Sequence, residues 1–498
     1  MNKNSYSHST RNGRRARRKQ HIPKKLALLS LFASTLLLVG GGVYIAHALQ
    51  SRSTAKETVD DQDNDYNKKE ALLLEKIRQD QKEAALASTE QTEVTDKVQT
   101  LLYDPVQKGA IPRFSALKNE LATMIDTVKR KHSNQQPIKI VGQVKMSNVT
   151  DQLKNYQPLL TIYSWDEKNR SWSEKTEPGA TSDFVNQKNN QELTLTDLFT
   201  SEANLLAVQQ VIKQKLLDDS PDGNTVIDSI LSMPNMSLKN TSFTYHPDKI
   251  SFNLPENATG SKEVSLAYRE IAEYVNPEFV DQASIKDALV MPLDPNKKYI
   301  SLTFDDGPNP KTTPKLLDIL KEKGVKATFF MLGQNVVKNE AIVKRADEEG
   351  HEVASHSYSH PQLTAVDAER IKTEVQNTDK VIYHAIGKLP TDFRPPYGAV
   401  DPDAAAIISK PIIQWSVDSQ DWQSHSIDKI IQRIHDTEYN DAIILMHDIY
   451  PETVDAVPIV IDRLRAEGYE IIPTKQLLGN KAKPMHMYYG STDERPIQ

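Results

Sequence analysis

Cysteine is absent from the 498-residue sequence. The chain therefore forms neither disulfides nor thiolate metal sites, and any metal must be bound by histidine and carboxylate side chains. An excess of basic residues is also absent, because the formal net charge is -6 at pH 7. This charge gives no indication of nucleic-acid binding, so nucleic acid is not expected among the partners. The length predicts two or three folded domains, since a domain typically has about 50 to 250 residues.

The N-terminal part of the sequence predicts a membrane anchor. Residues 1–25 carry a basic run without an acidic residue, and residues 26–48 form an uncharged, mainly apolar segment. A helix of that length crosses a bilayer at about 1.5 Å per residue, and basic residues before a first span mark the cytoplasmic side. We therefore expect a basic cytoplasmic tail, a transmembrane signal anchor and an extracellular body. Cleavage after Ala48 is the alternative, because Ala46-His47-Ala48 resembles a signal-peptidase site and would release a secreted protein.

Two regions of different composition follow the predicted anchor. Residues 49–100 are rich in Asp, Glu, Lys, Gln and Ala, which indicates a charged helical linker or, alternatively, a disordered spacer. Residues 101–290 contain short strand-like runs, such as residues 138–144, between helical periods, and residues 264–274 predict a helix. We therefore expect an α+β accessory domain over residues 101–290. Its aromatic residues either stack on sugars or cap a small core.

Residues 291–478 alternate apolar strand-like runs with amphipathic helical segments. Residues 299–304, for example, are typical of a buried strand, and residues 313–323 of the helix after it. Repeated βα units require parallel strands joined by right-handed crossovers. We therefore expect an α/β domain built as a distorted (β/α) barrel, with its site residues just past the strand ends. Residues 479–498 have mixed polarity and are expected to form a poorly ordered C-terminal tail.

Two adjacent carboxylates, Asp305 and Asp306, directly follow the strand predicted over residues 299–304. Successive residues of an extended segment point to opposite sides, so one carboxylate can bind a metal while the other takes a proton. An ordinary Asp-Gly-Pro turn explains this stretch equally well when the stretch is considered alone.

Two histidines, His356 and His360, follow the strand-like run over residues 352–355. In one helical turn or in a compact loop, both rings can face one ion. Together with one carboxylate of the aspartate pair they supply three protein ligands and leave a free position, which is the arrangement of a catalytic zinc site. A pair of histidines at this spacing is weak evidence by itself, and the carboxylates at another strand end strengthen it.

Further candidate residues follow other predicted strands. Arg394 can clamp a carboxylate, and the two prolines after it fix the direction of the Tyr397 backbone N–H, which can then face a developing oxyanion. His447 ends a strand, and a carboxylate partner would fix its tautomer and favour its protonated form, as a general acid requires. Trp422 and Leu445 can wall a small apolar pocket.

Taken together, these residues resemble the five motifs of the polysaccharide deacetylases of carbohydrate esterase family 4, the NodB homology domain. The resemblance covers about residues 296–475, and the motifs occur in the order found in the family. The layout of anchor, α+β region and C-terminal domain also resembles that of the streptococcal peptidoglycan N-acetylglucosamine deacetylases in this family. The five motifs are Thr303-Phe304-Asp305-Asp306-Gly307-Pro308, His356-Ser357-Tyr358-Ser359-His360, Arg394-Pro395-Pro396-Tyr397, Asp421-Trp422 and Leu445-Met446-His447.

The resemblance implies a role for each motif residue in a catalytic domain over residues 291–478. It implies a zinc ion, or alternatively cobalt, and a general base that is oriented by an arginine. It also implies a histidine acid tuned by a carboxylate, a backbone N–H for the oxyanion and two side chains around the acetyl methyl group. The implied metal ligands are Asp306, His356 and His360; the base and its orienting residue are Asp305 and Arg394; the acid and its partner are His447 and Asp421; the oxyanion donor is Tyr397; and the methyl pocket is formed by Trp422 and Leu445.

The implied function is the metal-dependent hydrolysis of the N-acetyl group of N-acetylglucosamine in cell-wall peptidoglycan. Such an amidohydrolase releases acetate and makes the wall a poorer substrate for lysozyme. Its partners would be the glycan strands and, through the N-terminal helix, the cell membrane, with the body facing the cell wall. Two alternatives stay open, namely a deacetylase of another polysaccharide such as chitin, xylan or an exopolysaccharide, and a wall-binding protein whose middle region supplies the function.

Overall fold

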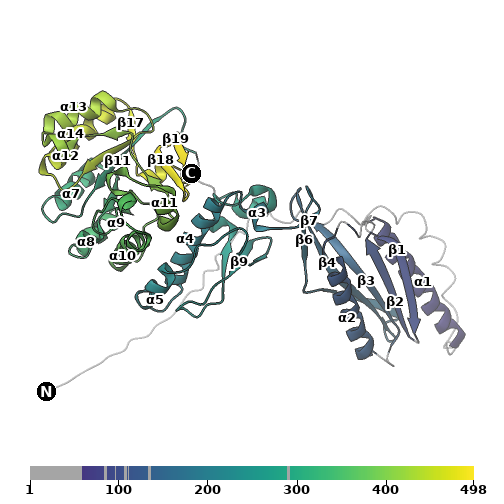
Figure 1. Ribbon diagram of the computed structural model, residues 1–498. Coiled ribbons are helices and arrows are strands. Elements are labelled where there is room, and N and C mark those ends of the chain that lie inside the picture. Colours follow the sequence, from purple (N-terminus) through teal and green to yellow (C-terminus); the bar gives the residue numbers. More distant parts are fainter. Residues whose placement is uncertain are drawn as a thin grey trace, which may run out of the picture. The chain divides into compact units, whose positions relative to one another are not determined.

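A computed structural model describes most of the chain (Figure 1). The predicted cytoplasmic tail, the predicted membrane span and the first part of the linker lie outside the described residues. Within the described part of the chain, no helix combines the length and the apolar character needed to cross a membrane. The described part of the chain divides into two units between Lys76 and Ile77. The described residues are 59–83, 87–95, 97–105, 109, 111–132, 136–288, 292–479 and 481–497.

Among the described residues of the predicted linker, the helical ones are 59–83. Helix α1 spans Val59–Glu83 and ends well before residue 100. Strand β1 (Ala87–Thr95) then pairs antiparallel with β2 (Val98–Pro105), so the accessory region begins earlier than predicted. The prediction was wrong here because β1 is an edge strand of polar residues, and it lacks the apolar alternation that identifies a strand in a sequence.

The first half of the accessory region is a sheet covered by a helix. Its strands lie in the order β1-β2-β3-β4-β6-β7, and β5 pairs with β4. Helix α2 (Phe114–His132) packs Leu121 and Ile125 against Ile140 and Leu160 of the sheet. The remaining strands are β3 (Ile138–Asn148), β4 (Leu153–Asp166), β5 (Ser171–Pro178), β6 (Asp183–Asn186) and β7 (Gln191–Glu192).

The second half of the accessory region has a separate hydrophobic core. The predicted helix over residues 264–274 is wrong, because Val264 and Leu266 alternate into this core from a strand that is followed by a 3-10 turn. The accessory region is therefore α+β, as predicted, but it contains more than one core. The elements around the second core are α3 (Leu195–Leu198), α4 (Glu202–Asp218), α5 (Gly223–Leu231), β8 (Phe243–Tyr245), β9 (Lys249–Asn253), β10 (Glu263–Ala267) and α6 (Gln282–Ile285).

Parallel strands of the C-terminal domain form a ring. Their pairing order is β13-β12-β11-β16-β15, and β17 also pairs with β11. Phe393 bridges β13 to β14, and β14 and β15 are the two ends of residues 412–418, so the ladder returns on itself. This ring is the distorted barrel that the sequence predicts. Its strands are β11 (Lys298–Asp305), β12 (Thr328–Met331), β13 (Glu352–Ser355), β14 (Ile412–Ile413), β15 (Val417–Asp418), β16 (Ile443–His447) and β17 (Tyr469–Ile471).

Helices pack around this ring and bury its strands. Strand β11 is buried from Tyr299 onward, which is typical of a parallel strand that is covered on both faces. Leu316 of α7 and Val457 of α14 belong to the same core as Phe304 of this strand. The helices are α7 (Thr313–Lys323), α8 (Gly333–Val336), α9 (Glu340–Glu348), α10 (Ala368–Ile386), α11 (Pro402–Ile408), α12 (Asp421–Ser424), α13 (Ile427–Thr437), α14 (Pro451–Ala466) and α15 (Thr474–Leu477).

The C-terminal residues form a hairpin, so the prediction of a poorly ordered tail was wrong. Strand β18 (His486–Gly490) pairs parallel with β14 and antiparallel with β19 (Asp493–Pro496). Tyr488 is only 4% exposed and packs in a core cluster with Tyr299. The buried Tyr488 ring and the pairing with the open edge of β14 therefore hold the segment in place. The sequence does not reveal either contact, because the segment has mixed polarity.

Replacing Tyr488 with alanine should lower the free energy of unfolding by about 3 kcal/mol, because the change removes a buried aromatic side chain. Chemical denaturation of the full chain measures this difference, with Lys481→Ala at an exposed position as the control. An unchanged unfolding midpoint in Tyr488→Ala would contradict the packing of the hairpin.

Candidate active site

The carboxyl ends of the parallel strands bring the predicted site residues together. Asp305 of β11 lies directly beside His447 of β16 in the strand register. His356 follows the last residue of β13, and Arg394 follows Phe393, which bridges β13 and β14. The positions that the sequence scatters over about 140 residues therefore converge at one end of the ring.

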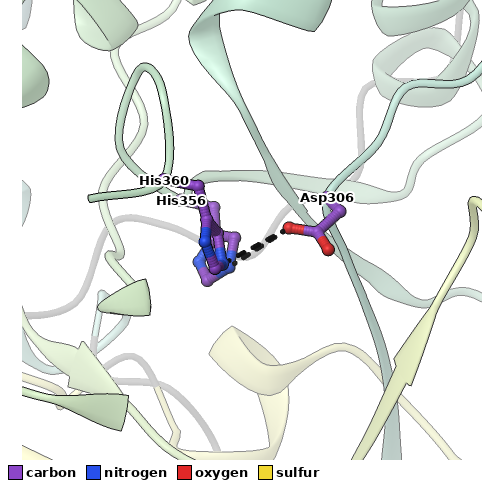
Figure 2. A group of neighbouring side chains, drawn as sticks. All are labelled: Asp306, His356 and His360. Carbon is purple, nitrogen blue, oxygen red and sulfur yellow. Dashed lines mark ion pairs between the residues drawn. The ribbon is translucent and has the colours of Figure 1, made fainter. Parts of the chain in front are cut away.

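Asp306, His356 and His360 form a cluster that fits a metal ion. Nε2 of each histidine lies 3.6 Å from Oδ1 of Asp306, and Figure 2 shows both rings facing this carboxylate. Ligands of a tetrahedral zinc ion lie about 3.4 Å apart, because each bond is about 2.1 Å long. Oδ1 of Asp306 is also buried without a hydrogen-bond partner. A cation between the three side chains would satisfy this oxygen.

The surroundings of His356 favour its neutral form, which a metal ligand requires. The ring is buried, and burial lowers the pKa of His356 to about 3. Its Nδ1 lies 2.7 Å from the backbone oxygen of Arg394, a contact in which Nδ1 donates and Nε2 faces Asp306. Such a hydrogen bond fixes both the tautomer and the orientation of a ligand ring.

Glu374 of α10 shapes the loop that carries both histidines. Its Oε2 accepts hydrogen bonds from the backbone N–H groups of Tyr358 and Ser359, both at 2.7 Å, and its Oε1 accepts one from Ser359 Oγ at 2.7 Å. The Glu374 carboxylate thus takes the place of the carbonyl oxygens that accept hydrogen bonds from backbone N–H groups in helices and sheets. Sequence reasoning missed Glu374, although a charged residue within the buried stripe of an amphipathic helix was a usable signal.

Asp448 supports the neighbouring loop and was also missed. It accepts a hydrogen bond from Thr313 Oγ1 and is completely buried, and burial raises the pKa of Asp448 to about 7. A side chain at Gly307 would collide with this carboxyl group. Only glycine therefore fits beside Asp306 at this position.

Asp305 is held by a buried arginine. Oδ1 of Asp305 accepts a hydrogen bond from Arg394 Nη1 at 2.8 Å, and both side chains are almost completely buried. Oδ2 of Asp305 lies 3.7 Å from Nε2 of His356 and so faces the metal cluster. Burial raises the pKa of Asp305, and the charge of Arg394 opposes this rise. The arrangement leaves one carboxylate oxygen available for a proton.

His447 is paired with a buried carboxylate. Its Nδ1 lies 2.8 Å from Oδ1 of Asp421, while Oδ2 of Asp421 accepts from the His447 N–H at 2.7 Å and from Thr453 Oγ1 at 2.8 Å. Burial disfavours the charged imidazole, but the hydrogen bond and the charge of Asp421 raise the pKa of His447 to about 9. His447 is therefore protonated at neutral pH.

The remaining predicted residues surround these groups. The Tyr397 ring is 68% exposed and packs edge-on against His360, with 4.6 Å between the ring centroids. Within the described part of the chain, the Tyr397 backbone N–H donates no hydrogen bond, so it is available to a ligand. Trp422 is 49% exposed, whereas Leu445 is buried. An exposed indole and a buried aliphatic side chain can form the rim and the floor of an apolar pocket.

Two family matches cover most of the described chain. Residues 293–411 match the polysaccharide deacetylase family, and residues 73–286 match the N-terminal domain of peptidoglycan GlcNAc deacetylases. The second match starts before the predicted boundary at residue 101 and includes β1 and β2.

Three curated relatives are similar to parts of the chain. Peptidoglycan-N-acetylglucosamine deacetylase PgdA of Listeria monocytogenes is 40% identical over 48% of this chain and 50% of its own length. Peptidoglycan-N-acetylmuramic acid deacetylase PdaC of Bacillus subtilis is 29% identical over 57% of this chain and 65% of its own length. Chitooligosaccharide deacetylase of Bradyrhizobium is 36% identical over 36% of this chain and 90% of its own length.

The match therefore spans about half the length of the Listeria relative and nearly all of the Bradyrhizobium relative. The family match over residues 293–411 contains Asp305, Asp306, His356, His360 and Arg394, which converge at the strand ends. The chain belongs to the polysaccharide deacetylase family.

Proposed function

We propose that the protein is a metal-dependent deacetylase that removes the N-acetyl group from N-acetylglucosamine residues of peptidoglycan. The observation that carries this proposal is the position of Asp305 and His447 beside the Asp306, His356 and His360 cluster. A proton acceptor, a proton donor and a metal-ligand set within one site are the parts that amide hydrolysis requires. The name of the Listeria relative and the match to the N-terminal domain of peptidoglycan GlcNAc deacetylases support this sugar and this polymer.

Asp306, His356 and His360 would hold the ion, for which we propose zinc, with cobalt as the alternative. A bound zinc ion would polarise the acetamide carbonyl and lower the pKa of a bound water. Neutral imidazoles and one carboxylate suit either metal, and the absence of cysteine excludes thiolate ligands.

Asp305 would act as the general base. Arg394 holds one oxygen of its carboxylate, so the other oxygen is turned toward the cluster and can take a proton from the attacking water. His447 would act as the general acid, because Asp421 keeps it protonated and engages Nδ1, which leaves Nε2 to donate to the leaving amine. Acetate and a free amino sugar are the products.

The Tyr397 backbone N–H would stabilise the negative charge that develops on the carbonyl oxygen. It is held in a left-handed conformation with φ of 60° by the rigid Pro-Pro segment before it. Trp422 and Leu445 would enclose the acetyl methyl group. This pocket would select for a small acyl group rather than for a particular polymer.

We further propose that residues 26–48 anchor the protein in the cell membrane with its body facing the cell wall. The basic run and the long apolar segment of the sequence support this location. A protein that is cleaved after Ala48 and secreted is the alternative. Both arrangements bring the deacetylase domain to the glycan strands.

Acetate release by the purified full chain tests the proposed activity. We expect release from peptidoglycan and from N-acetylglucosamine oligomers, loss of release after chelation and recovery with added zinc. A preference for acetylated xylan would instead indicate an esterase, and no release from any N-acetylated glycan with metal bound would favour a wall-binding role.

Another N-acetylated sugar is the second candidate substrate. The names of the Bacillus subtilis and Bradyrhizobium relatives favour N-acetylmuramic acid and chitooligosaccharides. The free amino groups of enzyme-treated peptidoglycan are labelled first, and acid hydrolysis then identifies the sugar that carries the new amine. We expect glucosamine, and labelled muramic acid would support the second candidate.

Two histidine variants should separate metal binding from proton transfer. His356→Ala should lose the zinc bound at the active-site cluster, because it removes one of the three ligands there. His447→Ala should keep its zinc and lose at least about 100-fold in turnover, as is typical for removal of a general acid. Zinc content by atomic absorption and acetate release check both variants. Equal zinc loss in both would show that His447 is a ligand.

Glu374→Gln should weaken zinc binding by about 10- to 100-fold, which is typical when a group that positions metal ligands is changed. An amide cannot accept all the hydrogen bonds that Glu374 accepts from Tyr358 and Ser359. Titration with a zinc indicator measures the change, and Glu369→Gln, at an exposed position of the same helix, is the matched control. Equal affinities in the two variants would refute this role.

Asp421→Asn should shift the alkaline limb of activity to lower pH. The pKa of His447 is raised to about 9, so its protonated form is present below that pH and is lost as the pH rises through it. Removing the Asp421 charge lowers this pKa, and activity should then fall at a lower pH. The pH profile of kcat/KM measures the shift, and an unmoved limb would exclude His447 as the acid.

A further inference from the structure

The C-terminal ends of two outer helices bring three metal-binding side chains together. Helices α13 and α14 pack against each other, at the upper left of Figure 1. Glu438 caps the C-terminus of α13, and Glu467 caps that of α14. His435 lies in the last turn of α13, and its Nδ1 is 3.4 Å from Oε1 of Glu438 and 3.1 Å from Oε1 of Glu467. These residues stand on helices, whereas the active-site cluster stands at strand ends.

The spacing of these atoms matches a metal site. One nitrogen and two carboxylate oxygens of the three residues all lie within 4.8 Å of one another. The two distances from His435 Nδ1 are close to the separation of about 3.4 Å between ligands of a tetrahedral zinc ion. His435 Nδ1 is therefore at ion-pair distance from both carboxylates at once, so one imidazole nitrogen and two carboxylate oxygens face a common point.

Glu438 has an oxygen without a partner. Its side chain is only 5% exposed, and its Oε2 is buried and accepts no hydrogen bond. A small cavity of about 10 Å³ adjoins it, close to the smallest volume that holds one water. The cavity has apolar walls and is lined by Ile431, Ile434, Val460 and Leu464 together with His435, Glu438 and Arg463. Glu438 also shares a hydrogen bond with the carboxyl group of Glu467, so either a proton or a cation must offset the charge of the two groups.

The charges at the two helix ends also favour a bound cation. The C-terminus of a helix carries a partial negative charge, so an acidic cap there is unfavourable. Here two helices place acidic caps beside each other. Among the described residues, the only ion-pair partner of both carboxylates is His435, and Arg463 at the cavity wall pairs with neither. Lys298 reaches only the backbone oxygen of Glu467, at 3.3 Å. A divalent cation would offset both carboxylates and both helix ends.

We propose that His435, Glu438 and Glu467 form a second divalent-cation site that binds zinc or a similar transition-metal ion. One imidazole nitrogen and two carboxylates are a donor set that zinc accepts, with a fourth position left for water. An ion there links the C-terminal turns of α13 and α14. The site therefore stabilises the outer helices of the deacetylase domain and takes no part in hydrolysis.

Titration of the metal-free, untagged full chain with zinc alone tests the proposal. We expect the wild-type chain to bind two equivalents by calorimetry and His435→Ala to bind one, with acetate release unchanged. His360→Ala should also bind one, without activity, and the double variant should bind none. Glu467→Gln removes the same equivalent as His435→Ala with a smaller change of structure.

Matched controls exclude binding to surface side chains. His384→Ala and Glu322→Gln, at exposed positions of α10 and α7, should keep both equivalents. In addition, zinc should raise the unfolding temperature of His360→Ala but not that of His360→Ala/His435→Ala. A wild-type chain that binds one equivalent, lost entirely in His360→Ala, would overturn the proposal. A second equivalent that persists in His435→Ala would show an adventitious ion only.

Discussion

The buried ion pair between Arg394 and Asp305 is the interaction on which the rest of the site depends. Arg394 is completely buried and donates to Asp305 Oδ1 and Thr303 Oγ1 of β11 and to the backbone oxygens of Ile413 and Gln414. It thus joins the first strand of the ring to the segment that closes the ring. Burying this guanidinium is costly unless its donors are satisfied, and here each of its three nitrogens donates a hydrogen bond.

The same arginine also connects the base to the metal cluster. Its backbone oxygen contacts Nδ1 of His356, while its side chain turns the free oxygen of Asp305 toward the cluster. Two imidazoles in one site then take opposite protonation states. Burial keeps His356 neutral, and the buried carboxylate of Asp421 keeps His447 charged. The surroundings of each ring, rather than the residue type, therefore decide that one histidine can serve as a metal ligand and the other as an acid.

The sequence predicts most of the barrel and the convergence of its strand-end residues, because βα alternation and the parallel-strand rule are local patterns with one common geometric outcome. Glu374 and Asp448 escaped prediction, since their roles arise from contacts with loops that are distant in the sequence. The hairpin around Tyr488 was not predicted for a related reason, because its strands depend on pairing with the open edge of β14. The early start of the accessory sheet was hidden by the polar composition of β1, where tertiary pairing overrides propensity.

The account depends most directly on the claim that Asp305 takes a proton while Asp306 holds the ion. Zinc content and acetate release of Asp305→Asn, measured on the same preparation, test this claim. We predict that zinc bound at the active site stays at the wild-type level and that turnover falls by about 100-fold or more, as expected for the loss of a general base. A variant that loses the active-site zinc, or one that keeps its zinc and its wild-type turnover, would contradict the account.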